Sequence, residues 1–80
     1  MKARVTIFLK PGVLDVQGKA VEGALHGLGW DAVSNVRVGK LIELELAGSD
    51  PHAARAEVDE MSRRLLANPV IESFTTEVVG

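Results

Sequence analysis

Polar and apolar residues alternate along residues 2–10, which predicts a strand with one buried face. The odd positions carry apolar side chains, and most of the even positions carry polar ones. Successive side chains of a strand point to opposite faces of the sheet, so one row enters a core and the other meets solvent. Phe8 interrupts the polar row and suggests that part of the second face is also covered.

A helical repeat follows the strand and is bounded by recognisable signals. Pro11-Gly12 ends the strand, and Asp15 is predicted to cap the helix because its carboxylate can accept free amide hydrogens of the first turn. Gly29 is predicted to end the helix in the left-handed conformation. The large apolar positions of this helix are Val21, Leu25 and Leu28.

Glycines inside this helix require a reason other than helix propensity. Gly18, Gly23 and Gly27 each weaken a helix by about 1 kcal/mol relative to alanine. Close packing against a neighbouring segment would favour such residues. Gly18 lies in the first turn, where another strand or another chain can pass closely, so it is a candidate interface residue.

Two strand-like runs, residues 33–38 and 41–47, flank Gly39-Lys40 and predict a β-hairpin. Arg37 and Lys40 flank the predicted turn on a chain that is slightly acidic overall. Such cations are either solvated charges or a docking handle for a partner, and we retain both residues as interface candidates.

A second helix and a last strand complete the pattern. Asp50 is predicted to cap this helix with Pro51 at its first position, and Asn68-Pro69 ends it. Residues 70–79 are predicted to form a strand. The helix positions expected to face the core are Ala54, Val58, Met61 and Leu65. The ion pairs expected on its outer face are Asp59 with Arg63 and Glu60 with Arg64.

The predicted order is β-α-β-β-α-β, which is that of a ferredoxin-like α+β fold with an antiparallel sheet and two helices. We expect residues 1–80 to form one such domain. In this arrangement the first and third strands are central. The second and fourth are edges, which expose backbone groups that another chain can pair with.

Size and composition favour a protein that associates with others. The chain has 80 residues and no cysteine, so its core is limited and no disulfide can stabilise it. We therefore expect a homodimer or a dimer of dimers. A formal net charge of −2 does not favour nucleic acid or an anionic membrane as partner. The N-terminus enters a strand directly, without the apolar region of a signal peptide, so we expect a cytoplasmic protein.

Residues that could carry chemistry are few. His26 and His52 have no second type of metal ligand at a suitable spacing, and we interpret both as solvated. Ser49, Asp50 and His52 are neighbours in one turn, which gives no support for a catalytic triad. We find no glycine-rich nucleotide motif and predict no catalytic residue, no cofactor and no metal. Trp30 follows Gly29; a plug at the end of the core is the favoured interpretation and a contact with another chain is the alternative.

The chain resembles the PurS family, the small subunits of phosphoribosylformylglycinamidine (FGAM) synthase. The resemblance extends over essentially the whole chain and depends on four stretches in a fixed order. These are Pro11-Gly12-Val13-Leu14-Asp15-x-Gln17-Gly18; Ala24-Leu25 through Leu28-Gly29-Trp30; Val36-Arg37-Val38-Gly39-Lys40 with Ile42-Glu43-Leu44; and Glu60-Met61 with Leu65-Leu66-Ala67-Asn68-Pro69-Val70-Ile71-Glu72.

The resemblance implies a role in purine biosynthesis as a non-catalytic subunit of an ATP-dependent, glutamine-hydrolysing ligase. It implies two partner subunits besides a second copy of the chain. The large synthase subunit, PurL, binds ATP, magnesium and the ribonucleotide, and the glutaminase subunit, PurQ, releases ammonia. The small subunit joins them and supports ammonia transfer. The resemblance assigns no catalytic residue, so the candidates remain the interface residues Arg37, Lys40, Trp30 and Gly18.

Two alternatives remain open. ACT-type modules, which bind small metabolites and regulate enzymes, share the predicted element order and often a Pro-Gly-Val-Leu run after the first strand. The continuation through Gln17-Gly18 and the stretch from Asn68 to Glu72 do not belong to that pattern. The third interpretation is a structural adaptor in some other complex.

Overall fold

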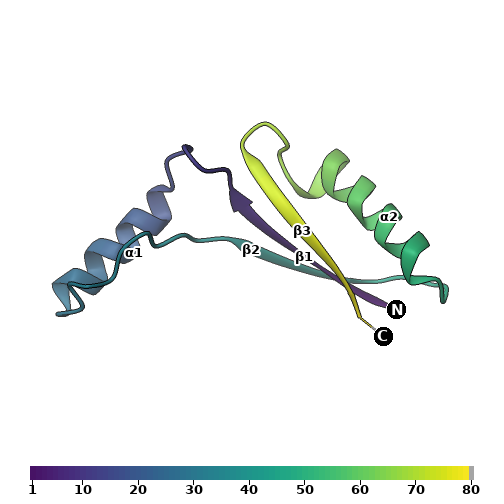
Figure 1. Ribbon diagram of the computed structural model, residues 1–80, viewed down its shortest axis with the longest axis horizontal. Coiled ribbons are helices and arrows are strands. Elements are labelled where there is room, and N and C mark those ends of the chain that lie inside the picture. Colours follow the sequence, from purple (N-terminus) through teal and green to yellow (C-terminus); the bar gives the residue numbers. More distant parts are fainter. Residues whose placement is uncertain (80) are drawn as a thin grey trace.

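The computed structural model describes residues 1–79 and contains a three-stranded antiparallel sheet with helices beyond it (Figure 1). The elements in chain order are β1 (Lys2–Leu9), α1 (Val16–Gly27), β2 (Lys40–Glu45), α2 (Pro51–Met61), the π-helical turn η1 (Ser62–Leu66) and β3 (Glu72–Val79). The strand order is β2-β1-β3. The α+β class with an antiparallel sheet and two α-helices is confirmed, in keeping with a ferredoxin-like fold.

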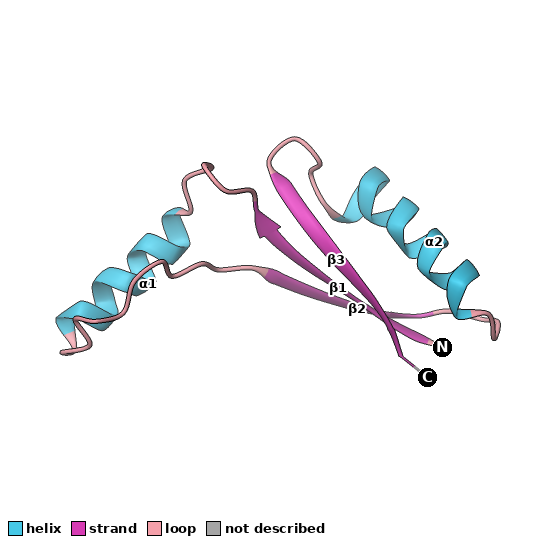
Figure 2. Cartoon of the chain, viewed as in Figure 1, coloured by secondary structure: helices cyan, strands magenta, loops and turns pink. Residues whose placement is uncertain are grey.

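The prediction of a hairpin is wrong, and the sheet in the described residues has three strands rather than four. Residues 33–39 have no regular secondary structure and lead into β2 without a chain reversal, as the long loop in Figure 2 shows. Gly39 has a different role from a turn residue. A Cβ there would lie 2.6 Å from Cε1 of Phe8 and 2.7 Å from the Ile7 carbonyl oxygen. The glycine permits β2 to begin close against β1.

The position of the edge strands also differs in part from the expectation. β1 is central, as predicted, and pairs with both neighbours, with Val5 opposite Ile42 on one side and Thr76 on the other. β2, which contains much of the strand expected to be central, is an edge. Both β2 and β3 therefore leave one row of backbone groups without a strand partner in the described chain.

The core lies between the sheet and α2. Its buried members are Ala3, Val5, Ile7, Val58 and Ala67. α2 packs across β1 and β3, and its start is as predicted. The Asp50 carboxylate accepts a hydrogen bond from the His52 amide at 3.0 Å, and Pro51 takes the first helical position.

The C-terminal part of α2 departs from the predicted stripe. Ala54 and Val58 are buried, but Met61 and Leu65 are exposed, and Ser62 is the next residue in the core. Ala54, Val58 and Ser62 are four residues apart in the regular part of the helix, so Met61 falls to one side of the buried face. Beyond Ser62, the π-helical turn, in which the Ala67 amide donates to the Ser62 carbonyl at 2.9 Å, displaces Leu65 outward.

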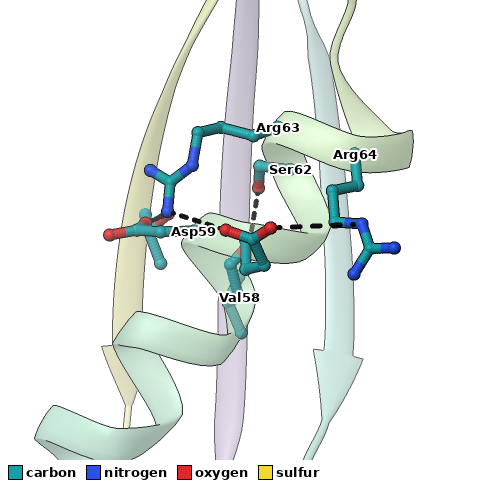
Figure 3. Close-up of polar contacts among 7 residues, drawn as sticks. Val58, Asp59, Ser62, Arg63 and Arg64 are labelled. Carbon is teal, nitrogen blue, oxygen red and sulfur yellow. Dashed lines mark hydrogen bonds and ion pairs between the residues drawn. The ribbon is translucent and has the colours of Figure 1, made fainter.

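Polar contacts on α2 also differ from the expected pairs (Figure 3). Glu60 lies 4.0 Å from Arg64, which confirms one pair. Arg63 contacts Glu60 at 3.2 Å rather than Asp59. Asp59 instead accepts a hydrogen bond from the Thr76 hydroxyl at 2.6 Å, which joins α2 to β3. The buried Ser62 hydroxyl donates to the Val58 carbonyl at 2.8 Å, so its polar atom is satisfied.

α1 projects from one end of the sheet, whereas α2 packs against the strands β1 and β3 (Figure 1). The Cα radius of gyration is 15.9 Å, whereas a compact domain of this length has about 12 Å. α1 makes at most marginal contact with the strands. The projecting unit, residues 16–38, comprises α1 and the extended segment after it; we refer to it as the arm. The part of the chain that the structure describes contains no helix long and apolar enough to cross a membrane.

Candidate interaction surfaces

Two turns that are far apart in the sequence meet at the arm end of the sheet. The Lys10 amide donates to the Ile71 carbonyl at 2.8 Å, and the Lys10 ammonium donates to the Pro69 carbonyl at 2.7 Å. The Asn68 side chain accepts from the Val70 amide at 3.1 Å. Residues 10–12 and 68–72 are thus held together, and the base of the arm is fixed against the sheet.

Asp15 joins the two halves of the arm. One carboxylate oxygen accepts from the Gly18 amide at 2.8 Å, which confirms the predicted cap of α1. The other accepts from the Val38 amide at 2.9 Å. These two amides, with a further contribution from the Arg37 charge, hold the pKa of Asp15 below 3.8, although partial desolvation opposes the shift. The ionised carboxylate therefore ties the start of α1 to the segment before β2.

Gly18 is where the extended segment passes closest to α1. An ideal Cβ on this residue would lie 2.3 Å from the Val36 carbonyl oxygen and 2.8 Å from Oδ2 of Asp15. The Val36 amide donates to the Glu22 carboxylate at 3.3 Å, which holds the segment along the helix. Close passage of a segment at Gly18 was expected, and here that segment is part of the same chain. The role of Gly18 in contact with a partner remains a prediction.

Glu72 has a similar joining role at the start of β3. Its carboxylate accepts from the Asn68 amide at 2.7 Å and lies 3.5 Å from the Lys40 ammonium. The Asn68 amide is the main cause of a lowered pKa, with Lys40 adding to it and partial desolvation opposing it. Lys40 is therefore engaged with its own chain.

Stability should consequently fall in acid through Asp15 and Glu72. Each has a folded pKa below its ordinary value of 3.8 or 4.5. The contribution is complete above those ordinary values and is lost as pH falls through the lower folded pKa. Thermal unfolding between pH 7 and pH 2 should show this loss. Glu72→Gln should lower the midpoint at pH 7 and flatten its decline in acid, whereas Glu57→Gln should retain the wild-type profile. Identical acid profiles for all three proteins would contradict the assignment.

An open cavity of about 420 Å³ lies between the base of the arm and the sheet. Ile7 and Leu9 of β1 line it from the sheet, Leu14 lines it from the turn before the arm, and Val16 lines it from the arm. Asp15, Lys40 and Glu72 supply its charged groups. Leu14 and Val16 are largely exposed, so the cavity is an apolar hollow with a polar rim.

The outer part of the arm carries further exposed apolar side chains. Trp30 is 58% exposed and Leu28 is exposed next to it. The expectation that Trp30 plugs the core is therefore wrong, because α1 stands away from the core. The alternative, a contact with another chain, remains a prediction. Leu28 was predicted to belong to the apolar stripe of this helix, and the structure leaves it exposed.

Arg37 and Lys40 do not flank a turn, since the predicted hairpin is absent. The Arg37 guanidinium lies over the Phe8 ring at 5.6 Å from its centroid, within the range of a cation–π contact. Lys40 faces Glu72. The four interface candidates thus occupy one half of the molecule, the arm and its junction with the sheet.

The histidines give no sign of a reactive centre. His26 is exposed, and its Nε2 lies 2.7 Å from the Val33 carbonyl oxygen. His52 is exposed at the start of α2. Among residues 1–79, no three histidine, cysteine, aspartate or glutamate side chains gather as metal ligands would.

Comparison with known proteins gives a consistent family. A family model described as PurS, phosphoribosylformylglycinamidine (FGAM) synthase, matches residues 2–80. The chain is 47% identical over 77 residues to the FGAM synthase subunit PurS of Synechocystis. The aligned region covers 96% of this chain and 77% of that protein.

Solved structures agree with this comparison. Bacillus subtilis PurS in its C2 crystal form is similar with a TM-score of 0.85 and 44% identity, covering 99% of this chain and 98% of that one. A chain in the structure of PurLQS from Thermotoga maritima is similar with a TM-score of 0.87 and 27% identity, covering 98% and 95%.

Proposed function

The chain belongs to the PurS family of FGAM synthase subunits, and from this membership we propose how it works within the enzyme. It is the PurS subunit of the synthase and acts in purine biosynthesis as part of a complex with the other subunits. It joins the ATP-dependent synthase subunit to the glutaminase subunit and supports the transfer of ammonia. The single domain spans residues 1–80, and the protein works in the cytoplasm.

The observation that carries this function is the match along the chain to a subunit that is also found within PurLQS. The geometry supports it, since hydrogen bonds and glycine contacts shape a projecting arm with apolar side chains at both ends. A regulatory module of the ACT type is set aside, because the match to PurS spans nearly the whole chain.

The exposed arm supports self-association. In a compact fold of this element order, α1 would lie on the sheet beside α2. Here α1 stands away, and apolar side chains remain open both on the arm and in the hollow that Ile7 and Leu9 line. A second copy of the chain can cover both surfaces, because the apolar arm of one copy can pack into the apolar hollow of the other. We therefore propose that two copies associate through the arm and the hollow.

Assembly with purified partner subunits tests the proposed function. Mixed with the large synthase subunit and the glutaminase subunit, the chain should co-elute with both in gel filtration, and light scattering should give the mass of a ternary complex. Each pair of subunits run alone is the control. If the chain elutes at its own mass when both partners are present with nucleotide and glutamine, the proposal fails.

Removing Arg37 and Lys40 together should weaken this assembly. Arginine can hold a carboxylate with two parallel hydrogen bonds, and an exposed cation steers an acidic partner in a salt-dependent way. In Arg37→Ala with Lys40→Ala, we expect affinity for the partners to fall and its salt dependence to shrink. The matched control is Lys2→Ala with Arg55→Ala, which removes the same charge elsewhere. Wild-type affinity of the first variant across a salt series would limit both residues to their contacts within the chain.

A further inference from the structure

We infer that β3 pairs with β3 of a second copy of this chain about a two-fold axis, and that this contact joins two dimers into a tetramer. The contact is distinct from the arm and the hollow, and the tetramer rests on the self-association proposed above. β3 is an edge of the sheet and has one strand neighbour, β1, in the described chain. An open strand edge is a template for pairing with another chain.

Contacts at the two ends of β1 show which backbone groups of β3 are free. The Lys10 amide donates to the Ile71 carbonyl on the β3 side, whereas Met1 and Leu46 exchange backbone hydrogen bonds on the β2 side. The backbone N–H and C=O groups of successive strand residues point alternately to the two sides of the strand. Because the register between β1 and β3 is continuous, the odd-numbered residues of β3 bond to β1. The free row on β3 belongs to the even-numbered residues Phe74, Thr76 and Val78.

A two-fold axis at Thr75 satisfies this free row. Phe74 of one copy then lies opposite Thr76 of the other, and the two residues exchange both of their backbone hydrogen bonds. On the exposed face of the strand, Thr75 meets Thr75, and Ser73 meets Glu77. Threonine pairs and hydroxyl contacts across neighbouring strands are stabilising. This register sets no two like charges opposite each other, so the sequence of β3 is complementary to itself.

The other edge strand, β2, is not complementary to itself. By the same argument, its free backbone row belongs to Leu41, Glu43 and Glu45. A two-fold axis at Glu43 sets two carboxylates opposite each other, an axis at Leu44 sets Glu43 against Glu45, and an axis at Ile42 sets a leucine against a carboxylate. Like charges opposite each other destabilise a strand pair, and charged side chains commonly protect a free edge. β3 is therefore the edge that favours a second copy.

The position of α2 is compatible with this pairing. α2 crosses the face of the sheet over β1 and β3, and β2 lies on the far side of β1 (Figure 3). Neighbouring strands are about 4.8 Å apart. Pairing of the two β3 strands would therefore set the α2 helices of the two copies about 10 Å apart, close to the usual distance between packed helices.

The arm gives the β3 contact its context. An arm dimer presents two β3 edges, so two dimers can join through two such contacts. Once one contact has formed, the second forms within the same assembly at a high effective concentration. The result is a closed assembly with symmetric interfaces, as is usual for homo-oligomers. A chain whose arm contact is removed has a single β3 edge and should stay monomeric at micromolar concentration.

Thr75→Lys tests the inference, and Ser73→Lys is the matched control. Both side chains are exposed on the same face of β3, so both variants should fold with a wild-type melting temperature. In Thr75→Lys two ammonium groups meet at the axis, and the dissociation constant of the tetramer should rise at least about tenfold. In Ser73→Lys the ammonium meets Glu77, so the tetramer should persist. Sedimentation equilibrium over a concentration series measures both masses.

A charge reversal at the same position checks the register. Thr75→Glu alone should also stop at the dimer, whereas an equimolar mixture with Thr75→Lys should give the tetramer, because opposite charges then meet at the axis. Hydrogen exchange provides a second measurement on the wild-type protein. The amides of the free row on β3 should be more protected in the tetramer than in the dimer, whereas those of the free row on β2 should exchange alike in both.

Three results would overturn the inference. A Thr75→Lys tetramer as stable as that of the wild-type chain would exclude β3 from the contact. An equal loss in Ser73→Lys would show that the register is wrong. A wild-type chain that remains a dimer at the highest concentration would refute the β3 contact and leave the arm contact intact. A wild-type monomer would instead refute the proposed self-association together with the inference.

Discussion

Gly18→Ala is expected to destabilise the protein although alanine is the better helix former. The new methyl group would lie 2.3 Å from the Val36 carbonyl oxygen, which is backbone and cannot rotate away. Either the segment after α1 must move off the helix or the Asp15 carboxylate must shift, since its Oδ2, which accepts from the Val38 amide, would be 2.8 Å away. Overpacking of this kind costs about 1–3 kcal/mol. In a domain of this size, each kcal/mol lowers the melting temperature by about 4–8 °C.

Gly23→Ala is the matched control in the same helix. A Cβ at Gly23 would meet no atom within 4 Å. Only the higher helix propensity of alanine should therefore matter, and it should raise the free energy of unfolding by up to about 1 kcal/mol. The two substitutions are chemically identical and should change the melting temperature in opposite directions. A rise in both variants, with partner assembly intact, would show that Gly18 holds no close contact.

Replacing Leu28 and Trp30 by glutamine should abolish self-association. Both side chains lie at the end of the arm and are largely exposed. Buried aromatic anchors commonly contribute 2 kcal/mol or more to an interface, so the double change should weaken the dimer by about a hundredfold or more. Sedimentation equilibrium at micromolar concentration should then give the monomer mass, with strand content in circular dichroism retained.

The control for the arm is Leu41→Gln, an exposed apolar side chain on the edge strand β2. It should leave the mass of the wild-type assembly unchanged. A wild-type protein that is already monomeric at micromolar concentration would contradict self-association itself. An unchanged mass in the Leu28 and Trp30 variant would instead move the contact to another surface.

Local signals predicted the elements whose causes are local. Asp15 and Asp50 cap their helices as expected, and Gly29 follows α1 with a positive φ of 105°. β1 was predicted to within one residue, because a core on one face forces the alternation of its side chains. These features depend on neighbours within a few positions in the chain.

The errors arose where a distant neighbour decides the conformation. Gly39 reads as a turn residue in the sequence, but its true constraint is the Phe8 ring across the strand pair. Leu65 reads as a core position, but one inserted residue in η1 turns it outward. The interpretation of Trp30 as a residue that closes the end of the core assumes that α1 packs on the sheet of its own chain. Periodicity describes which residues avoid water, and it does not say whether the covering surface belongs to the same chain.

The most direct test of the account is turnover by the reconstituted synthase. The large synthase subunit and the glutaminase subunit are mixed with ATP, formylglycinamide ribonucleotide and glutamine, and this chain is titrated in. Glutamine-dependent formation of formylglycinamidine ribonucleotide should require the chain and saturate at a fixed ratio. Synthesis from added ammonia should depend on it less. Full glutamine-dependent turnover by the two partners without this chain would contradict the account.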